Sequence, residues 1–290
     1  MPELPDVVVY CEALHARLRG QALANVRIAS PFVLRTAEPA LTSLVGKRVV
    51  DVHRLGKRIV LDFEDDLHLV IHLMIAGRLR WLASDKKPPA RITLALFEFP
   101  TGTLVLTEAG TKRRASLHLV QGREALAGHD NGALDVAKAD PATFAARLRA
   151  ENHTLKRALT DPHILSGIGN AYSDEILHRA RLSPLAHTAK LDDAAMGRLH
   201  RAAVEVLGEW TERLRSETGT GFPEKVTAFR PQMAVHGKFR EACPVCGTPV
   251  QRIVYAENEC NYCPGCQTGG VILADRALSK LLHKSFPRKI

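Results

Sequence analysis

The sequence contains no apolar run long enough to cross a membrane. A membrane-spanning helix needs about 20 consecutive apolar residues, and the most apolar stretch, residues 67–75, is interrupted by His68 and His72. The first residues also contain no positively charged segment followed by an apolar core, which a signal peptide would have. We therefore expect a protein of the cytoplasm that has no membrane partner.

Acidic residues are too few to balance the basic ones. The 290 residues include 40 Lys and Arg but only 31 Asp and Glu, so the formal net charge is +9. Lys and Arg that contact phosphates release condensed counterions, so this excess favours a polyanionic partner. Charge alone leaves open a basic protein without such a partner. The length and a hydrophobic content of 46% indicate about two domains with packed cores.

Cysteine is scarce outside one short segment. Five of the six cysteines lie between residues 243 and 266, and in a reducing compartment such cysteines are typical of metal sites or free thiols. Two CxxC pairs are separated by sixteen residues, a spacing typical of a structural tetrahedral zinc site. Four thiolates close the coordination shell, so the ion would hold a hairpin together rather than activate water. We predict one structural zinc ion bound by Cys243, Cys246, Cys263 and Cys266, with Cys260 as a buried or spare thiol.

Apolar periodicity divides the chain into a strand-rich part and a helix-rich part. Residues 6–18 have helical spacing, and Gly20 is placed to end this helix. Short strand patterns at 26–28, 49–52, 58–63, 68–73, 92–97, 103–107 and 116–120 indicate a sandwich or barrel. Asp140 and Pro141 then start helical patterns at 141–150, 153–159, 171–180 and 192–215. A glycine-containing loop at 216–222 leads to the cysteines, and a last short helix is predicted at 274–284.

The chain begins MPELPD, and removal of Met1 would leave Pro2 as the N-terminus. Its secondary amine can attack a sugar aldehyde carbon and form a cationic Schiff base. An α-amino group has a pKa of about 7.7 to 8.0, so a modest lowering by a neighbouring cation leaves an appreciable neutral fraction at neutral pH. Glu3 is placed to move protons at the sugar. The alternative is a proline that follows Met1 without any catalytic role.

Two further patterns carry candidate phosphate ligands. Lys57 follows Gly56 in a predicted tight turn between two strands. This lysine is either simply solvated or faces the same groove as Pro2, where it would bind a phosphate and lower the pKa of the amine. The segment from Lys156 to the GIGN tetrapeptide at 167–170 reads as helix, glycine turn and helix. Backbone amides at the start of the second helix can meet a phosphate, and a simple helical hairpin is the alternative.

The order and spacing of these features, from residue 2 to residue 266, resemble the formamidopyrimidine-DNA glycosylase and endonuclease VIII (Fpg/Nei) family. We interpret the chain as a divergent member. The resemblance implies an α+β multidomain fold: an N-terminal β-sandwich catalytic domain with a leading helix (1–125), a helix-two-turns-helix DNA-binding domain (126–222), a four-cysteine zinc finger (223–270) and a basic C-terminal extension (271–290). DNA would bind in the cleft between the N-terminal domain and the rest.

The resemblance also implies a bifunctional DNA glycosylase and apurinic-site lyase. Pro2 would attack C1′ of the damaged nucleotide, Glu3 would act as general acid and base, and Lys57 would contact the active site and a phosphate. The damaged base would be flipped out and removed, and the strand would then be cleaved by elimination. Backbone phosphates would be bound by Lys156, Gly169 and Asn170. The implied partner is damaged double-stranded DNA, bound by a monomer without a nucleotide cofactor in a bacterial-type cytoplasm, associated with the nucleoid through DNA.

The finger departs from the family pattern. Asn258 stands five residues before the third cysteine of the module, where the family has an arginine that helps to hold a phosphate, and it lies between Glu257 and Glu259. Asparagine keeps hydrogen bonding but loses the charge and the fork geometry of arginine. Asn258 is therefore a candidate DNA contact, and we expect it to bind a phosphate more weakly than the family's arginine.

The residues that fill the space left by a flipped base also differ. Ile75 aligns with the family's methionine, with Met74 one place earlier, and Arg113 supplies the arginine, but no phenylalanine follows it. Asp6 replaces a glutamate at the end of the opening motif. The extension after residue 266 contains basic residues that either contact DNA or cover the finger: Arg276, Lys280, Lys284, Arg288 and Lys289.

Two other functions stay open at this point. The altered finger is compatible with a non-catalytic damaged-DNA or abasic-site binding protein on the same scaffold. A zinc-ribbon regulator that reads DNA sequence with its basic face is a third interpretation, and it leaves the opening MPELPD unexplained.

Overall fold

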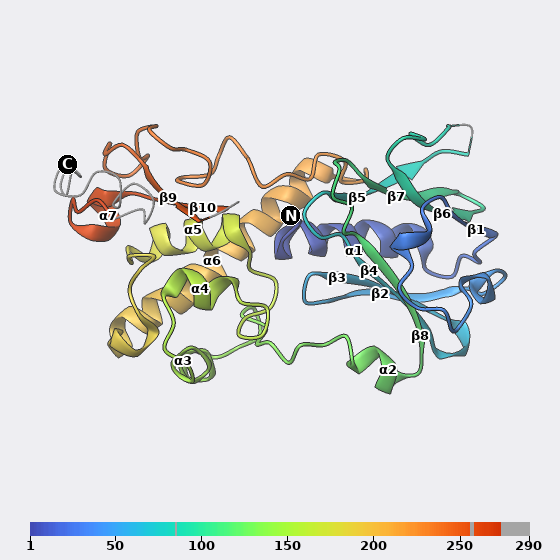
Figure 1. Ribbon diagram of the computed structural model, residues 1–290, viewed down its shortest axis with the longest axis horizontal. Coiled ribbons are helices and arrows are strands. Elements are labelled where there is room, and N and C mark those ends of the chain that lie inside the picture. Colours follow the sequence, from blue (N-terminus) through green and yellow to red (C-terminus); the bar gives the residue numbers. More distant parts are fainter. Residues whose placement is uncertain (85, 256–257, 274–290) are drawn as a thin grey trace. The chain divides into compact units, whose positions relative to one another are not determined.

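The computed structural model describes the chain except for residues 85, 256–257 and 274–290 (Figure 1). Its residues group into two compact units, of which the first comprises Met1–Asn131 and Trp210–Thr227 and the second Gly132–Glu209 and Ala228–Ile290. The domain boundaries given above stay predictions. The predicted helix at 274–284 and the basic residues of the tail lie outside the described residues. In the described part of the chain, no helix has both the length and the apolar character needed to cross a bilayer.

Two four-stranded antiparallel sheets form the framework of the first unit. Their strand orders are β2-β3-β4-β8 and β1-β6-β7-β5. The strands are β1 (Asn25–Ile28), β2 (Val49–Leu55), β3 (Arg58–Phe63), β4 (Leu67–His72), β5 (Gly77–Leu82), β6 (Thr93–Phe99), β7 (Gly102–Glu108) and β8 (Ser116–Gln121). The seven predicted strands are present, and β5 is an addition that the apolar pattern did not indicate. The unit also contains α1 (Leu4–Leu18), α2 (Arg123–Ala127) and three 3₁₀ turns, η1 (Pro31–Val33), η2 (Leu41–Leu44) and η3 (Glu64–Asp66).

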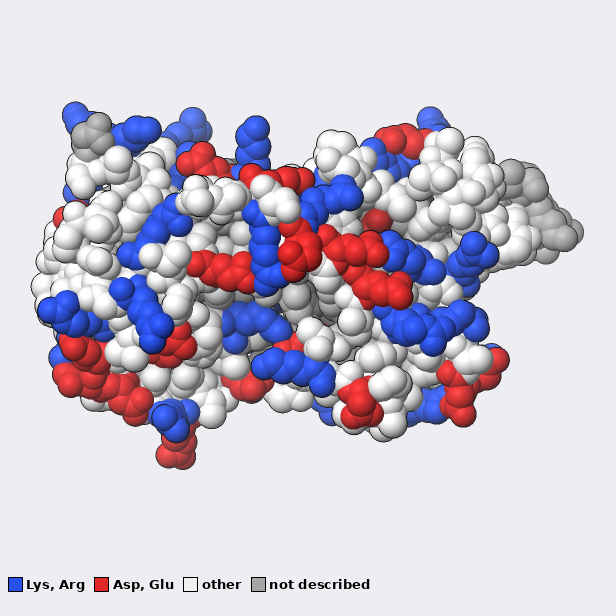
Figure 2. Space-filling view, turned by 180° about the vertical axis from the view of Figure 1, so that it is seen from behind, with Lys and Arg blue, Asp and Glu red and all other residues white. Residues whose placement is uncertain are grey.

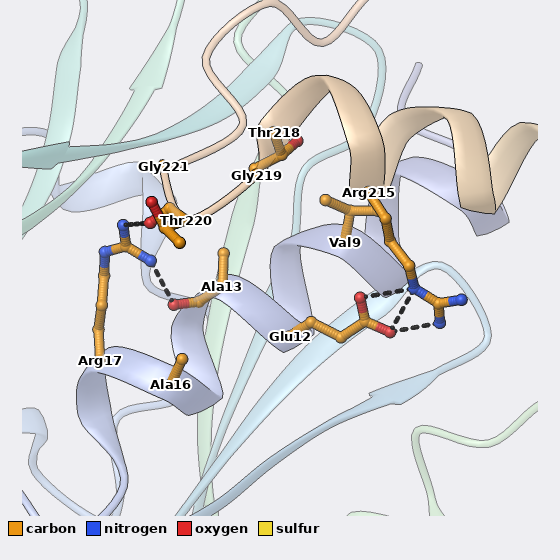
Figure 3. A pocket seen from close by; sticks show the side chains of 10 residues that line it. All are labelled: Val9, Glu12, Ala13, Ala16, Arg17, Arg215, Thr218, Gly219, Thr220 and Gly221. Carbon is orange, nitrogen blue, oxygen red and sulfur yellow. Dashed lines mark hydrogen bonds and ion pairs between the residues drawn. The ribbon is translucent and has the colours of Figure 1, made fainter.

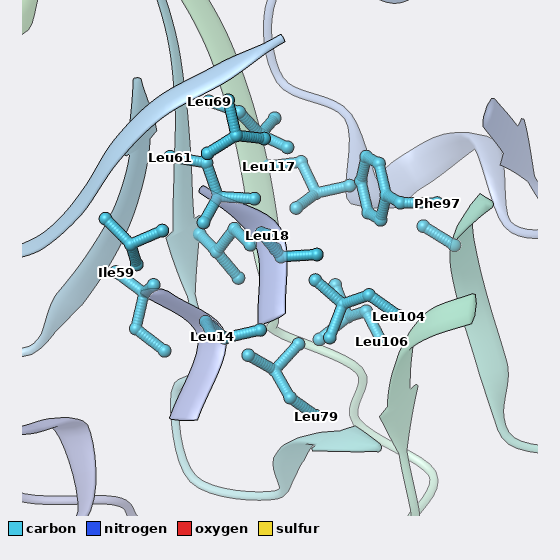
Figure 4. Packing of buried hydrophobic residues seen from close by; sticks show 14 of the residues in the cluster. Leu14, Leu18, Ile59, Leu61, Leu69, Leu79, Phe97, Leu104, Leu106 and Leu117 are labelled. Carbon is cyan, nitrogen blue, oxygen red and sulfur yellow. The ribbon is translucent and has the colours of Figure 1, made fainter. Parts of the chain in front are cut away.

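Helix α1 and both sheets share one buried hydrophobic cluster (Figure 4). Strand alternation sends Ile59 and Leu61 of β3 to the same face, where they oppose Ile71 and Leu69 of β4. Helix α1 adds a stripe at helical spacing that includes Leu14, which is fully buried. The inner faces of the two sheets therefore enclose a sandwich core, and the helix that begins next to Pro2 is anchored in it.

The second unit consists of helices and a short hairpin. Its elements are α3 (Pro141–Arg149), α4 (Leu155–Thr160), α5 (Asn170–Ala180), η4 (Thr188–Lys190), α6 (Asp193–Thr218, whose residues from Trp210 belong to the first unit), β9 (Gln251–Tyr255), β10 (Asn258–Tyr262) and α7 (Pro264–Thr268). The side chain of Asp140 accepts hydrogen bonds from the amides of Ala142 and Thr143, both at 2.9 Å, so the predicted cap with Pro141 in the first turn is confirmed. The predicted mixed architecture of sheet domain, helical domain and cysteine module is confirmed.

The solvent side of the β2-β3-β4-β8 sheet carries a histidine–carboxylate chain. Asp62 Oδ2 lies 3.1 Å from His53 Nε2, and its Oδ1 lies 2.6 Å from His68 Nδ1. The hydrogen bond to Asp62 raises the pKa of His53 above 6.5, although burial opposes it. Burial alone would raise the pKa of Asp62, but the hydrogen bonds from the two histidines outweigh it, so this pKa falls below 3.8. His53 and Asp62 therefore each stabilise the charged form of the other.

We expect the contribution of His53 to stability to depend on pH. Its folded-state pKa is raised, so the contribution is complete below the unfolded value of 6.5 and disappears as the pH rises through the folded-state value. His53→Gln should therefore lower the free energy of unfolding most at mildly acidic pH and least at alkaline pH. Urea unfolding of both proteins across this range measures the difference. In an Asp62→Asn background the difference should shrink, and a pH-independent effect of His53→Gln would contradict this account.

Candidate functional site

The N-terminal residues are held at the start of α1. The amide of Glu3 donates a 3.0 Å hydrogen bond to Asp6 Oδ2, and both side chains are buried. Glu3 is the N-cap residue, so Asp6 occupies the third helical position, where an acidic side chain commonly satisfies the amide of the cap. Pro5 is tolerated in the first turn because that turn needs no amide donor. The shorter carboxylate at position 6 therefore still performs the capping function, and it fixes the peptide that follows Pro2.

The terminal amine lies among charged groups of both signs. In the chain that still carries Met1, burial lowers the pKa of the Met1 amine below 8.0; Arg78 and Lys57 lower it further, and Glu3 and Asp6 oppose them. Burial also lowers the pKa of Lys57, which Glu3 partly restores. Pro2, Glu3 and Lys57, which the sequence predicts as catalytic, thus share one neighbourhood. Their catalytic roles stay predictions.

Lys57 occupies the turn between β2 and β3. Leu55 pairs with Arg58, which leaves Gly56 and Lys57 as a two-residue loop. Gly56 has a φ of +61°, as the first central residue of a type II′ hairpin turn requires. The turn that the sequence predicts is therefore present, and it holds the partly buried Lys57 within electrostatic reach of Glu3.

Arg78 is a site residue that the sequence reasoning missed. Its Nε donates to the carbonyl of Val226 at 2.7 Å, and its Nη1 donates to the carbonyls of Gly77 at 2.7 Å and Ile75 at 3.1 Å. The residue lies on β5, and the alternation of Arg78, Leu79 and Arg80 is the signal that would have indicated that strand. Arg78 joins the loop before β5 to the segment that follows α6.

The end of α6 and the loop after it form hydrogen bonds and an ion pair with α1 (Figure 3). Arg215 Nε donates to both carboxylate oxygens of Glu12, at 2.9 and 3.1 Å. Arg17 donates from Nη1 to the carbonyl of Ala13 and from Nη2 to the carbonyl of Thr220, each at 3.0 Å. Arg17 and Arg215 line a small pocket between α1, the end of α6 and the loop after it. Both are engaged within the protein, and their contacts hold α1 in place.

Two loops of the first unit present the residues predicted to fill the space of a flipped base. Ile75 is 58% exposed in the turn between β4 and β5. Gly77 begins β5, and this position requires glycine because a Cβ there would lie 2.2 Å from the carbonyl oxygen of Leu73. Arg113 is exposed in the loop between β7 and β8, and its Nη2 donates to the carbonyl of Arg91 at 2.8 Å. Their contact with DNA stays a prediction.

A buried carboxylate anchors the second of these loops. Glu108 is 1% exposed, and its Oε2 accepts hydrogen bonds from the amides of Arg114 at 2.9 Å and Ala115 at 3.0 Å. A carboxylate that accepts backbone hydrogen bonds replaces its lost water with fixed donors. The basic tip of the loop therefore projects from a rigid base.

Lys156 is engaged inside the second unit. Its ammonium donates to the carbonyl of Asn170 at 2.8 Å, to Ser173 Oγ at 2.8 Å and to Asp174 Oδ1 at 2.6 Å. An ammonium has three hydrogens, so each has an acceptor. The structure thus brings Lys156 to the GIGN loop through the Asn170 carbonyl. Its contact with a phosphate stays a prediction.

The GIGN loop leads directly into α5. Gly167 has a φ of +85°, a conformation that favours glycine, and the buried Gly169 is the N-cap residue. Asn170 begins the helix, and its Nδ2 donates to the carbonyl of Glu259 at 2.8 Å. The start of this helix carries the positive end of its dipole, a feature that favours anions. Asn258 begins β10 opposite Tyr255, and its side chain is outside the described part of the structure.

Asp174 and Glu175 are buried acids that the sequence reasoning missed. Asp174 is fully buried, and its Oδ2 lies 2.8 Å from His236 Nδ1 and accepts the amide of Asn261 at 3.1 Å. Glu175 accepts three amides, from Ala234 at 2.8 Å and from Val235 and His236 at 2.9 Å. Two adjacent acids in a helix whose other members include Tyr172, Ile176 and Leu177 were the available signal. They join α5 to the segment before the cysteines and to β10.

The cysteine thiols gather as the spacing predicts. Cys246 Sγ lies 3.3 Å from Cys263 Sγ and 3.4 Å from Cys266 Sγ, and Cys243 Sγ lies 3.9 Å from Cys266 Sγ. Four sulfurs around one zinc ion with bonds of about 2.3 Å stand about 3.8 Å apart, so the thiols fit this ion. Cys260 is fully buried, as expected, and packs with Ile253 and Tyr262.

His178 also reaches this cluster, which the sequence did not indicate. Its Nε2 lies 3.3 Å from Cys243 Sγ, and one ligand atom from each of His178, Cys243, Cys263 and Cys266 falls within 4.8 Å of the others. The residue comes from the end of α5 and not from the finger. The cluster as a whole can hold a metal ion, and α5 contacts it directly.

Charged side chains of both signs share the protein surface. On the face shown in Figure 2, Lys and Arg are interspersed with Asp and Glu. Several basic groups are paired locally: Arg179 contacts Glu209 at 2.8 Å, and Arg149 contacts Asp193 at 2.7 Å. The net charge therefore does not locate a polyanion site by itself, and the loops predicted above stay candidates for one.

Removal of the charge of Asp174 should destabilise the second unit strongly. Asp174→Asn leaves the Lys156 ammonium buried without its counter-charge, a change that costs about 3–5 kcal/mol. The matched control is Asp193→Asn, which breaks an exposed pair and should change stability very little. Urea unfolding followed by circular dichroism measures both. Equal effects of the two variants would contradict the importance of the buried carboxylate.

Comparison with known proteins agrees with this geometry. The family model of the formamidopyrimidine-DNA glycosylase N-terminal domain matches residues 1–117, and that of the formamidopyrimidine-DNA glycosylase H2TH domain matches residues 133–220. The formamidopyrimidine-DNA glycosylase of Thermus thermophilus is 34% identical over 282 residues, which cover 93% of this chain and 100% of that protein. A formamidopyrimidine-DNA glycosylase-like protein of Mycobacterium tuberculosis is 41% identical over 150 residues, which cover 52% of this chain and 91% of that protein.

Solved structures resemble the whole described fold. A crystal structure of the LlFpg protein with a THF-DNA and an inhibitor has a TM-score of 0.82 at 25% identity, and the match covers 92% of this chain and 100% of that chain. A complex of Lactococcus lactis Fpg with DNA that contains an oxidized pyrimidine has a TM-score of 0.80 at 25% identity, with the same coverage. From the matching domain models, the full-length relatives and the shared fold, we conclude that the chain belongs to the Fpg/Nei family.

Proposed function

We propose that the chain is a DNA base-excision repair glycosylase that removes a damaged base and cleaves the resulting abasic site through Pro2. The observation that carries this proposal is the partly buried terminal amine, which lies within electrostatic reach of Glu3, Lys57 and Arg78 and whose pKa is lowered. The DNA glycosylase names of the relatives and the DNA in their structures support the substrate class.

The proposed reaction begins after Met1 is removed. The neutral amine of Pro2 attacks C1′ of the damaged nucleotide, and the bond from C1′ to the base breaks as the base leaves with its electron pair and takes up a proton. Glu3 donates and accepts protons at the sugar as the ring opens and the iminium forms. The iminium then draws electrons from C2′, so that a proton leaves C2′ and the 3′ phosphate departs. Water finally hydrolyses the Schiff base and restores the amine.

The electrostatic setting favours the attacking form of the amine. Pro2 is one residue from the Met1 amine, whose pKa is lowered by burial and by the cations Arg78 and Lys57. The same environment would enlarge the neutral fraction of the Pro2 amine at neutral pH. Lys57 would additionally meet a phosphate beside the reacting sugar.

The remaining candidate residues are proposed as DNA contacts. Gly169 and Asn170 offer the start of α5 to a backbone phosphate, and Lys156 supports the same loop through its bond to the Asn170 carbonyl. Ile75 and Arg113 are proposed to enter the space left by the flipped base, and Asn258 is proposed as a weak phosphate contact of the finger. We propose that the protein works as a monomer on damaged double-stranded DNA in the cytoplasm, at the nucleoid.

The trapping of the Schiff base tests the mechanism directly. Borohydride added during reaction with abasic-site DNA should give a covalent complex, because it reduces the iminium. The trapping rate should rise with pH through the pKa of the amine, which we expect below the ordinary 8.0. Pro2→Gly should suppress trapping, with mass spectrometry as the control that Met1 is removed in both proteins. Absence of trapping by the natural protein would refute the lyase mechanism and leave the non-catalytic binding protein, which the Asn258 substitution favours.

One structural zinc ion is proposed for the cysteine cluster, bound by Cys243, Cys246, Cys263 and Cys266. The ion would supply no reaction chemistry, since its four thiolate ligands leave no open position. Cys263→Ser should abolish stoichiometric zinc and reduce DNA binding, because the cluster contacts α5 through His178. Metal analysis of the purified protein and fluorescence anisotropy measure the two effects. Cys260→Ser is the matched control, and it should retain the zinc; equal loss in both variants would contradict the ligand set.

A further inference from the structure

The second unit carries a large aromatic ring that is exposed to solvent and yet packs against buried residues. Phe229 is 67% exposed, and its ring stacks on that of His236 with centroids 5.5 Å apart and an interplanar angle of 20°. An isolated exposed phenylalanine needs no explanation. This ring, however, rests on a side chain that is itself 3% exposed.

The support beneath the ring is rigid. Gly237 has a φ of +72°, and a Cβ at this position would lie 2.8 Å from Phe229 Cδ1, so the ring lies directly against the glycine. His236 is bonded through Nδ1 to the fully buried Asp174 and through its amide to Glu175. The position of Phe229 is thus set by the same buried network that holds the GIGN loop.

Two cations lie over a second aromatic ring of this segment, one from the segment itself and one from β9. The guanidinium carbons of Arg240 and Arg252 lie 5.1 and 4.4 Å from the ring centroid of Phe239, and Arg240 is exposed. Surfaces that bind unpaired nucleotides combine aromatic rings for the bases with cations for the phosphates. The segment 229–240 thus carries two aromatic rings, Phe229 and Phe239, and the exposed cation Arg240, which are the side-chain types of a nucleotide-binding surface.

We propose that Phe229 is a stacking platform for a nucleobase of damaged DNA that has lost its pairing partner. This inference rests on the proposed function and adds a residue to it. A ring fixed in advance loses little conformational freedom on binding, and a phenylalanine offers no hydrogen bond that would choose among bases.

Binding of three DNAs by variants of Phe229 tests the platform. The probes are a duplex with an abasic-site analogue, the same duplex fully paired, and the single strand. Phe229→Leu should bind the abasic duplex and the single strand about 5- to 150-fold more weakly, the range expected for one lost base–aromatic stack, and should bind the paired duplex like the natural protein. Phe229→Tyr keeps a ring and should bind all three normally. Phe32, which is 83% exposed in the first unit, gives the matched control Phe32→Leu, and it should change nothing.

The outcomes separate the platform from a folding defect and from the proposed function. Equal binding by the natural protein and Phe229→Leu on all three DNAs would overturn the platform, and so would an equal loss on all three, which would indicate a structural role. If the natural protein shows no preference for the abasic duplex, the proposed function fails. The single strand then decides the platform alone, and unchanged binding by Phe229→Leu there overturns it. Thermal melting and zinc content verify that each variant is folded.

Discussion

The second unit depends on the ion pair and the hydrogen bonds of one buried carboxylate, that of Asp174. It is fully buried, and it meets the Lys156 ammonium, the His236 ring and the Asn261 amide. A charge taken out of water is costly unless an opposite charge and hydrogen-bond donors replace the solvent. Here those partners come from α4, from the segment before the cysteines and from β10. The charge can be satisfied only when the three segments have assembled around α5.

Helix α5 consequently connects the candidate phosphate loop with the cysteine cluster. Its first residue, Asn170, belongs to the candidate phosphate loop, and His178 reaches the cysteine cluster about 12 Å further along the helix axis. Asp174 and Glu175 lie between these positions. They bind His236, on which the ring of Phe229 stacks. The cysteine cluster, the candidate phosphate loop and the proposed stacking surface thus share one helix, so we expect a disturbance at one of them to reach the others through packing.

Several parts of the site could be predicted because they depend on neighbours in the chain. The helix start behind Pro2, the turn at Gly56 and the two CxxC pairs are local patterns, and the structure contains each of them. For Lys156, local patterns do not predict the surroundings of the side chain. The sequence presents a lysine before a glycine-rich loop and suggests a free cation for phosphate, whereas the fold buries it on three acceptors. Burial depends on segments that the local sequence does not identify.

The chemistry that is available can be seen in the sequence: a proline directly after Met1 and next to a glutamate, cysteines with metal-site spacing, and an excess of basic residues. The folded protein surrounds these groups with partners that the sequence does not indicate. It added Arg78 to the surroundings of the terminal amine, His178 to the cysteine cluster and a rigid support to Phe229. The amide partners of Glu175 and Asp174 lie 59 and 87 residues away in the chain, from Ala234 and from Asn261. Contacts over such separations follow from how the whole core packs, and no local periodicity encodes them.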